Sequence, residues 1–225
     1  MKRISIFVSG NGTNLQRIAE YFSGNSDVEI VNVVCNNPQA YAIERAKNLG
    51  IPVRMITKVE FNSPEFTEEM KNLDLNLIVL AGFLWKIPAS LIQAYPRQIV
   101  NIHPALLPKY GGKGFYGEHV HEAVVAAKEP FSGITVHYVN EIYDNGEFIL
   151  QAYTKLDADE TPDSLAAKIH KLEQAYFPVA IEQVLFGRQC LKPVAHDLRA
   201  LDHVDESIGV KESQISLQLD QIRTV

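Results

Sequence analysis

The sequence predicts a single α/β domain with a mostly parallel sheet, helices on both faces of the sheet, and an antiparallel C-terminal extension of the sheet. Three observations support this prediction. Short apolar runs alternate with segments of helical pattern through the first hundred residues, and repeated strand, helix, strand units require a parallel sheet covered on both sides. The apolar runs are continuous rather than alternating, as in strands buried on both faces. Beyond residue 112 two strand-like runs follow one another through a segment that contains Asp-Asn-Gly, which predicts an antiparallel pair joined by a tight reversal.

The elements are expected in the following order along the chain. Strands are expected at 4–8, 28–35, 52–56, 75–82 and 99–103, with helices between them at 14–22, 40–50 and 63–73. A helix at 118–129, strands at 133–139 and 147–156, and a long helix from 161 to 187 are expected to follow. Thr161 is a candidate cap for the long helix, and Pro178 is expected to kink it. This order predicts a Rossmann-like domain over residues 1–187; residues 188–225 form a C-terminal tail that the pattern leaves unassigned.

Composition excludes several classes of function. The chain has 225 residues, of which 46% are hydrophobic, and a formal net charge of -6. Phosphate-backbone binding requires a dense field of Lys and Arg, so a nucleic-acid partner is not expected. No stretch approaches the roughly 20 apolar residues of a membrane helix, and the first apolar run is too short for a signal peptide. We therefore expect a cytoplasmic protein without a membrane partner.

A glycine-rich loop, SGNGTN at residues 9–14, follows the first strand and opens the first helix. Backbone N–H groups and the helix dipole favour an anion at such a position. A dinucleotide fingerprint would need a third glycine where Leu15 stands, and an acidic residue at the end of the second strand, where two asparagines stand. Two interpretations remain: Gly12, Thr13 and Asn14 hold a single phosphate group, or Thr13 or Asn14 only caps the helix.

Asn101 and His103 lie at the carboxyl end of the fifth expected strand, where open α/β sheets bind ligands. Residues two apart on a strand face the same way, and an amide beside an imidazole suits a carbonyl that turns into an oxyanion. Asp144 could hold the imidazole charged, because a nearby carboxylate raises its pKa. The alternatives are that His103 only packs, and that Asp144 only forms the Asp-Asn-Gly turn.

These stretches resemble the folate-dependent formyltransferases, most closely those that act on glycinamide ribonucleotide in purine synthesis. The resemblance runs in order from residue 4 to about 187. It includes the segments SGNGTNLQ, LAGF at 80–83, NIHPALLPKY, GITVHYV and DNGEFILQA. It implies that the catalytic residues are Asn101, His103 and Asp144. It also implies that the substrate phosphate is bound by Gly12, Thr13 and Asn14.

The resemblance implies two further groups of contacts. Glu173 matches a glutamate that contacts the nucleotide; otherwise it would be one charge on a solvated helix face. The folate pocket would be formed by Leu84, Trp85, Lys86 and Ile87, together with Asn101. At the first two of these four positions another family member has Met-Arg, so side-chain contacts there are expected to differ. The resemblance also implies a phosphate and nucleotide half at about 1–100 and a folate and catalytic half at about 80–187.

The expected co-substrate is 10-formyltetrahydrofolate, and no metal is expected. His119 and His121 lie in a loop longer than that of many relatives, and without a third ligand we expect both to be solvated. His137 is expected to pack or to support the site rather than to react. The expected partners are small-molecule substrates, and the chain is expected to be a monomer or a homodimer.

The implied reaction is attack of the substrate amine on the formyl carbon, with an oxyanion stabilised by Asn101 and protonated His103. The amine must be neutral and the imidazole charged, which predicts a bell-shaped pH profile. Alternatives are a formyltransferase for a sugar nucleotide or initiator tRNA, a 10-formyltetrahydrofolate hydrolase, and a binding module without catalysis. The tRNA enzymes carry an additional basic domain, for which this acidic chain has little room.

Overall fold

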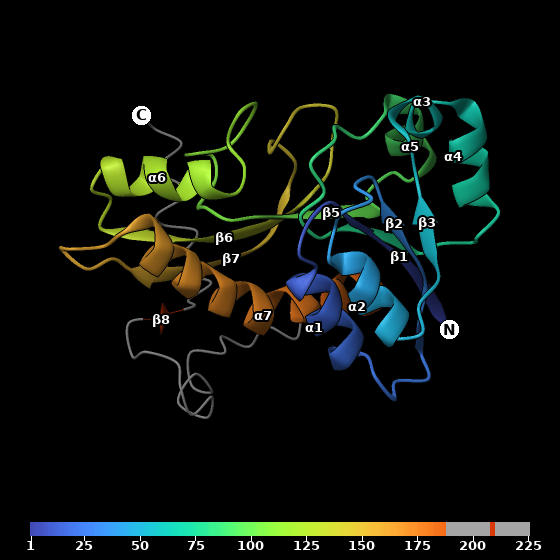
Figure 1. Cartoon of the computed structure of the whole chain (residues 1–225), viewed down its shortest axis with the longest axis horizontal. Coiled ribbons are helices and arrows are strands. Elements are labelled where there is room, and N and C mark those ends of the chain that lie inside the picture. Colours follow the sequence, from blue (N-terminus) through green and yellow to red (C-terminus); the bar gives the residue numbers. More distant parts are fainter. Residues whose placement is uncertain (188–207, 210–225) are drawn as a thin grey trace.

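The computed structural model describes residues 1–187 and 208–209 and contains one eight-stranded sheet in the order β3-β2-β1-β4-β5-β6-β7-β8 (Figure 1). The strands are β1 (Lys2–Val8), β2 (Val28–Cys35), β3 (Val53–Met55), β4 (Leu77–Leu80), β5 (Ile99–His103), β6 (Phe131–Tyr138), β7 (Phe148–Lys155) and β8 (Ile208–Gly209). The first five pair in parallel, whereas β5–β6, β6–β7 and β7–β8 are antiparallel. The predicted fold class is confirmed.

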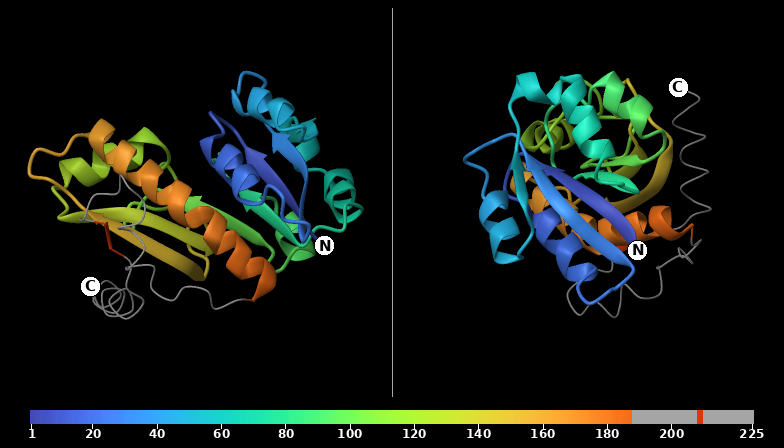
Figure 2. Two further views of the ribbon diagram at one scale, coloured as in Figure 1. Left: turned by 90° about the horizontal axis from the view of Figure 1, so that it is seen from below. Right: turned by 90° about the vertical axis from the view of Figure 1, so that its right-hand side faces the viewer.

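Helices cover both faces of the sheet (Figure 2). One face carries α1 (Thr13–Tyr21), α2 (Ala42–Asn48), α6 (Glu118–Ala126) and α7 (Pro162–Phe186), and the other carries α3 (Lys58–Phe61), α4 (Pro64–Lys71) and α5 (Ala89–Ala94). Each set buries its apolar side chains in its own core. Strand β4 separates the two cores, and all four of its residues are buried. This explains why the central strands are apolar on both faces.

Two short helices, α3 and α5, were not expected from the sequence. Helix α3 begins at a capping box in which the Thr57 side chain accepts from the Glu60 backbone N–H, and the Glu60 carboxylate accepts from the Thr57 N–H. The Thr-x-x-Glu spacing is a sequence signal for this start. Helix α5 spans only six residues and has no side-chain cap, so its pattern is too short to recognise.

Helix α7 is continuous across Pro178. Its start is the predicted one, because the Thr161 side chain accepts from the Ser164 backbone N–H. A proline inside a helix leaves the carbonyl four residues earlier without its usual donor. Here that carbonyl belongs to Gln174, and it accepts a hydrogen bond of 3.1 Å from Arg17 Nε of α1. The helix ends at Gly187, whose φ of 60° lies in the left-handed region.

The connection between β6 and β7 differs from the tight reversal that the sequence predicted. The two strands end and begin at Tyr138 and Phe148, so residues 139–147 form a longer loop. Within it Asp144 adopts a φ of 51°, a conformation that Asp tolerates in turns. Gly146 packs against the Tyr138 carbonyl so closely that a Cβ could not be placed there. Within this loop, the Asp144 carboxylate lies close to His103 at the end of β5.

Of the predicted C-terminal tail, only residues 208–209 lie within the described part, where they pair with Tyr153 and Thr154 of β7. The other tail residues, Cys190 among them, lie outside the described residues. Among the described residues, no helix is long and apolar enough to cross a membrane.

Candidate active site

A cavity of about 640 Å³ lies at the carboxyl ends of β1, β4 and β5. The chain passes from β1 outward to β2 and β3, and then returns to place β4 on the other side of β1. The loops after β1 and β4 diverge at this switch point and leave a crevice, which is where open α/β sheets bind their ligands. Both loops line the cavity, together with residues from the loop before α6, from the β6–β7 loop and from α7.

The loop after β1 forms one end of the cavity. Gly12 precedes α1 with a φ of 80°, and no side chain caps the helix, so the alternative interpretation, in which Thr13 or Asn14 only caps the helix, is wrong. A Cβ on Gly12 would lie 2.7 Å from the Ala42 Cβ of α2, which makes glycine necessary here. Arg45 of α2 donates hydrogen bonds of 3.0 Å to the backbone and side-chain oxygens of Asn11. The loop is therefore held against α2, while the first N–H groups of α1 have no acceptor within the helix.

Glu173 lies in the same end of the cavity and is not on a solvated helix face. Its residue is only 9% exposed, and its carboxylate accepts a hydrogen bond of 3.1 Å from Asn14 Nδ2. Burial raises the pKa of the Glu173 carboxyl, and the Asn14 hydrogen bond and nearby His170 oppose that rise only in part. A buried carboxyl that lines a cavity is suited to hydrogen bonding with a polar ligand group.

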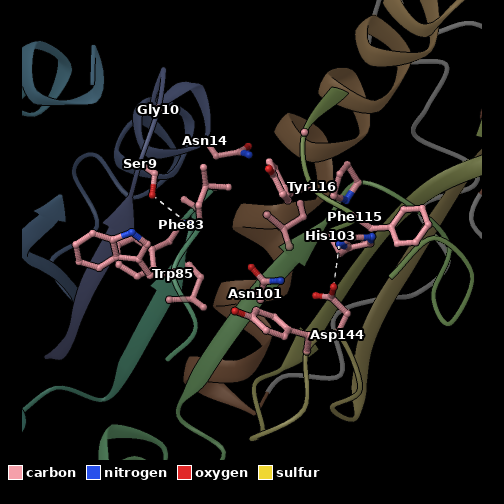
Figure 3. A pocket seen from close by; sticks show the side chains of 18 of the residues that line it. Ser9, Gly10, Asn14, Phe83, Trp85, Asn101, His103, Phe115, Tyr116 and Asp144 are labelled. Atoms are coloured by element: carbon pink, nitrogen blue, oxygen red, sulfur yellow. Dashed lines mark hydrogen bonds and ion pairs between the residues drawn. The ribbon is translucent and has the colours of Figure 1, made fainter. Parts of the chain in front are cut away.

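Asn101 and His103 extend from the end of β5 toward the opposite part of the cavity (Figure 3). Asn101 pairs with His137 of β6, and its Nδ2 lies 3.2 Å from His137 Nε2. His137 Nδ1 lies 2.9 Å from the Tyr138 carbonyl, which can only accept, so Nδ1 carries a hydrogen. In the neutral ring Nε2 is then free to accept from the Asn101 amide. His137 thus orients Asn101, and the ladder shifts register at His137, as is common beside active sites.

His103 is buried, at 4% exposure. Its Nε2 lies 2.7 Å from the Tyr110 carbonyl, so this nitrogen carries the hydrogen. Its Nδ1 faces Asp144 Oδ2 at 3.7 Å (Figure 3), a distance for an ion pair and too long for a hydrogen bond. Burial lowers the pKa of His103, and it outweighs the opposing effects of the Asp144 charge and the Tyr110 hydrogen bond. The predicted effect of Asp144 has the right direction, but the expectation of a raised pKa for His103 is wrong.

Asp144 is fixed by three neighbours. Its Oδ2 accepts a hydrogen bond of 2.9 Å from the Gly112 N–H, and its Oδ1 lies 3.6 Å from His137 Nε2. Burial raises the pKa of the Asp144 carboxyl, but the nearby His137 and His103 and the Gly112 N–H together hold it below its ordinary value. Asp144 is therefore an anion near neutral pH, and it does more than form a turn.

A buried network of hydrogen bonds beneath the Asn101, His103 and Asp144 corner holds the backbone that follows His103. Thr135 of β6 pairs with His103, and its hydroxyl donates to the Ala105 carbonyl at 2.7 Å and accepts from the Leu107 N–H at 3.0 Å. Gln151 Nε2 of β7 donates to the Leu107 carbonyl at 3.1 Å and to the Thr135 hydroxyl at 2.8 Å. The Ala105 carbonyl and both backbone polar groups of Leu107 thus have hydrogen-bond partners within the protein. This network gives His103 a rigid base.

The loop after β4 forms an apolar part of the cavity, and the four residues of this loop that were predicted for the folate pocket all line the cavity. Ser9 Oγ accepts from the Leu84 N–H at 2.9 Å, which joins this loop to the loop after β1. Trp85 contacts Phe61 and Phe83 through its ring, on the opposite side of the cavity from His103 (Figure 3). Lys86 lies with its Nζ 5.7 Å from the centre of the Tyr143 ring. Aromatic and aliphatic walls of this kind suit a flat ring system.

Two further histidines, His121 and His170, line the cavity, and sequence reasoning did not assign either of them to it. His121 is on α6 and only 6% exposed, so the expectation that it is solvated is wrong, whereas His119 is exposed and pairs with Glu122. Burial, then the nearby His170 and His103, lower the pKa of His121. His170 is on α7. Helical spacing was the available signal, because His121 lies three residues before buried Val124, and His170 three residues before Glu173. Within the described residues, there is no group of three or more His, Cys, Asp or Glu side chains that could hold a metal ion.

Comparison with known proteins gives consistent relatives. Residues 2–181 match the model of the family described as formyl transferase. A chloroplastic phosphoribosylglycinamide formyltransferase of Arabidopsis thaliana is 38% identical over 186 residues, which cover 79% of this chain and 64% of that protein. The chain thus spans less than two thirds of the length of this plant relative. The phosphoribosylglycinamide formyltransferase of Bacillus subtilis (strain 168) is 37% identical, over 82% of this chain and 95% of that protein.

The same relationship is found among solved structures. The crystal structure of glycinamide ribonucleotide transformylase 1 from Symbiobacterium toebii superposes with a TM-score of 0.76 at 29% sequence identity. The match covers 84% of this chain and 89% of that chain.

Proposed function

Because the chain belongs to the formyl transferase family, we propose that it transfers the formyl group of 10-formyltetrahydrofolate to the amine of glycinamide ribonucleotide, as a step in purine synthesis. The observation that carries this proposal is that one cavity joins an uncharged loop at a helix N-terminus to the Asn101, His103 and Asp144 corner. A ribonucleotide phosphate suits the first, and formyl transfer suits the second. The relatives described above are named for formyl transfer to this same acceptor, which supports the proposal.

The two ends of the cavity suit the two substrates. The N–H groups at Gly12, Thr13 and Asn14 would receive the phosphate, and Glu173 would accept from a polar group of the nucleotide. The apolar segment from Leu84 to Ile87 would hold the folate ring system. The two ligands would therefore meet at the carboxyl end of β5. The nucleotide contacts would come from both sequence halves, at about 1–100 and about 80–187, because Glu173 is on α7.

In the proposed reaction the nucleotide amine attacks the formyl carbon, and the carbonyl oxygen becomes an oxyanion. The Asn101 amide would stabilise this charge, and one such donor typically contributes about 3 kcal/mol. The attacking nitrogen must lose a proton, and the departing folate nitrogen must gain one. His103, neutral in the free protein because of its burial, would accept the first proton at Nδ1 and donate it to the second nitrogen, directly or through a water.

Asp144 would act on the charged intermediate. Once His103 gains its proton, the imidazolium faces the carboxylate across the 3.7 Å between Nδ1 and Oδ2. The oxyanion and Asp144 both favour the charged ring, so the pKa of His103 would rise as the intermediate forms. A lowered pKa in the free protein and a charged ring in the intermediate are thus compatible.

The acceptor is tested by incubating the full chain with 10-formyltetrahydrofolate and, in separate reactions, glycinamide ribonucleotide, charged initiator tRNA, an amino-sugar nucleotide, and water alone. The proposal predicts formylated glycinamide ribonucleotide as the main product. Preferential formylation of another acceptor, or release of formate at the same rate without an acceptor, would contradict it.

A further inference from the structure

Hydrogen bonds connect Glu129, at the end of the segment after α6, to His103. The Glu129 carboxylate accepts from the Tyr110 hydroxyl at 2.7 Å and from Lys109 Nζ at 3.0 Å. The backbone carbonyl of the same Tyr110 accepts from His103 Nε2 at 2.7 Å. A residue outside the cavity lining is thus linked through one tyrosine to the imidazole.

The Tyr110 backbone adopts a conformation that needs such support. Its φ is 57°, in the left-handed region that bulky residues rarely occupy. The side chain is held at its far end by Glu129, and its ring packs edge-on against Phe115 at 6.2 Å between centroids. Burial and the Glu129 carboxylate raise the pKa of Tyr110 to about 12, so the hydroxyl remains a donor at any physiological pH.

The same short segment contacts both members of the His103–Asp144 couple. The Tyr110 carbonyl accepts from His103, and two residues later the Gly112 N–H donates to Asp144 Oδ2 at 2.9 Å. The position of this segment therefore determines which imidazole nitrogen faces the carboxylate. Without the Tyr110 carbonyl the ring could rotate about its χ2 torsion, which has a broad energy profile.

We propose that Glu129 and Tyr110 are positioning residues that hold His103 with its Nε2–H on the Tyr110 carbonyl and its Nδ1 toward Asp144. They touch neither substrate, and they act by fixing the nitrogen that exchanges protons. The orientation of the ring stands on the geometry alone, whereas its consequence for turnover rests on the proposed function.

The test uses the full chain labelled with ¹⁵N-histidine and three variants. Tyr110→Phe removes only the hydroxyl that Glu129 holds, Glu129→Ala removes its acceptor, and Glu129→Gln retains an acceptor oxygen. Tyr21→Phe is a matched control, because the Tyr21 hydroxyl donates to Glu182 at 2.6 Å between α1 and α7, in a similar partly buried pair. Two quantities are measured: solvent exchange of the His103 Nε2 proton by NMR, and kcat and KM for both substrates.

In Tyr110→Phe and Glu129→Ala the Nε2 proton should exchange at least about 10-fold faster than in the wild type, because its acceptor is no longer held. The kcat should fall by roughly 10-fold to 100-fold with both KM values within about 2-fold of wild type, as expected for a misaligned catalytic group. Glu129→Gln should restore most of both properties, and Tyr21→Phe should change neither. If Tyr110→Phe does not fold, the two Glu129 variants decide the question.

Unchanged exchange of the Nε2 proton in Tyr110→Phe and Glu129→Ala would overturn the proposal, and so would faster exchange with unchanged kcat. Equal losses of kcat in Tyr21→Phe would also overturn it, since the effect would then be general destabilisation. If the wild type transfers no formyl group but the exchange results are as expected, the proposed function fails while the positioning of the His103 ring stands.

Discussion

His103 is surrounded by groups that change its pKa in opposite directions. Burial disfavours the charged ring, while the Asp144 carboxylate and the Tyr110 carbonyl favour it, and burial is the largest effect. A ring that is neutral before reaction and charged during it can both accept and donate a proton near neutral pH. The balance depends on Asp144, so a change of that single charge should be visible in the pH dependence.

Asp144→Asn keeps the size of the side chain and removes its charge. The pKa of His103 should fall further, because the carboxylate no longer offsets burial. The acidic limb of the kcat profile should move to lower pH, and kcat at neutral pH should fall by roughly 100-fold, because the imidazolium of the intermediate loses its counter-ion. NMR titration of the His103 ring in both proteins checks the first expectation. An unchanged midpoint together with unchanged turnover would show that Asp144 is only a turn residue.

Glu173→Gln should separate stability from binding. The pKa of this carboxyl is raised in the folded chain, so the folded state holds a proton that the unfolded state releases above its ordinary value of 4.5. The unfolding free energy of the wild type should therefore fall as pH rises above 4.5, until the folded carboxyl also ionises. The unfolding free energy of the glutamine variant does not fall in this way, because glutamine does not ionise. The variant should therefore be more stable than the wild type at neutral pH.

The same variant should bind glycinamide ribonucleotide more weakly, because an amide replaces a strong acceptor. Urea unfolding at pH 4.5 and pH 7 and calorimetric titration measure the two effects. A glutamine variant that is less stable than wild type at both pH values would contradict the stability argument.

Sequence reasoning identified Asn101, His103 and Asp144, and the structure brings these three together. They could be found because two share one strand face and the third lies in a recognisable turn. His137 was expected to pack or to support the site, but its contact with Asn101 could not be predicted, because that contact depends on the pairing of the two residues across β5 and β6. That register is not determined by either strand alone.

At the scale of elements, the loop between β1 and α1 depends on its contact with α2. The glycine pattern predicted a tight turn and an anion site, but it could not show that Gly12 lies directly against Ala42. Replacement of Gly12 therefore disturbs the packing of α1 and α2 as well as any phosphate contact.

Gly12→Ala should lower the unfolding free energy by about 1–3 kcal/mol, because the new methyl group overlaps with Ala42 and the φ of 80° disfavours a side chain. Nucleotide affinity should fall as well. Gly10→Ala is the matched control in the same loop, since a Cβ at Gly10 meets no atom within 4 Å. Urea unfolding of both variants measures the difference, and equal stabilities would refute the close contact between the two helices.

Most of the helices and strands followed from the sequence because their apolar periodicity is strong. The elements that were not expected, α3 and α5, span four and six residues, which is below the length at which helical periodicity can be recognised. The long loop at 139–147 was expected to be a tight reversal, because Asp-Asn-Gly is a turn signal wherever it stands in a connection. In the structure Gly146 packs directly against the Tyr138 carbonyl, a contact that the turn signal alone does not predict.

At the scale of the whole molecule, the cavity is assembled from segments that are far apart in the chain. The loop after β1 and helix α7 meet through Asn14 and Glu173, which are 159 residues apart. The parallel order of β1, β4 and β5 brings the loops that follow them to one edge. Sequence patterns place each segment at the end of an element, but only the folded sheet shows that His121 and His170 belong to the same cavity.

The central claim is that His103 exchanges protons with the reacting nitrogens in this cavity. The most direct measurement is kcat for formyl transfer from 10-formyltetrahydrofolate to glycinamide ribonucleotide, at saturating substrates, for wild type and His103→Ala, with folate affinity measured by calorimetry. The account predicts that kcat falls by about 100-fold or more while the folate dissociation constant changes little. Turnover close to that of the wild type in His103→Ala would contradict it.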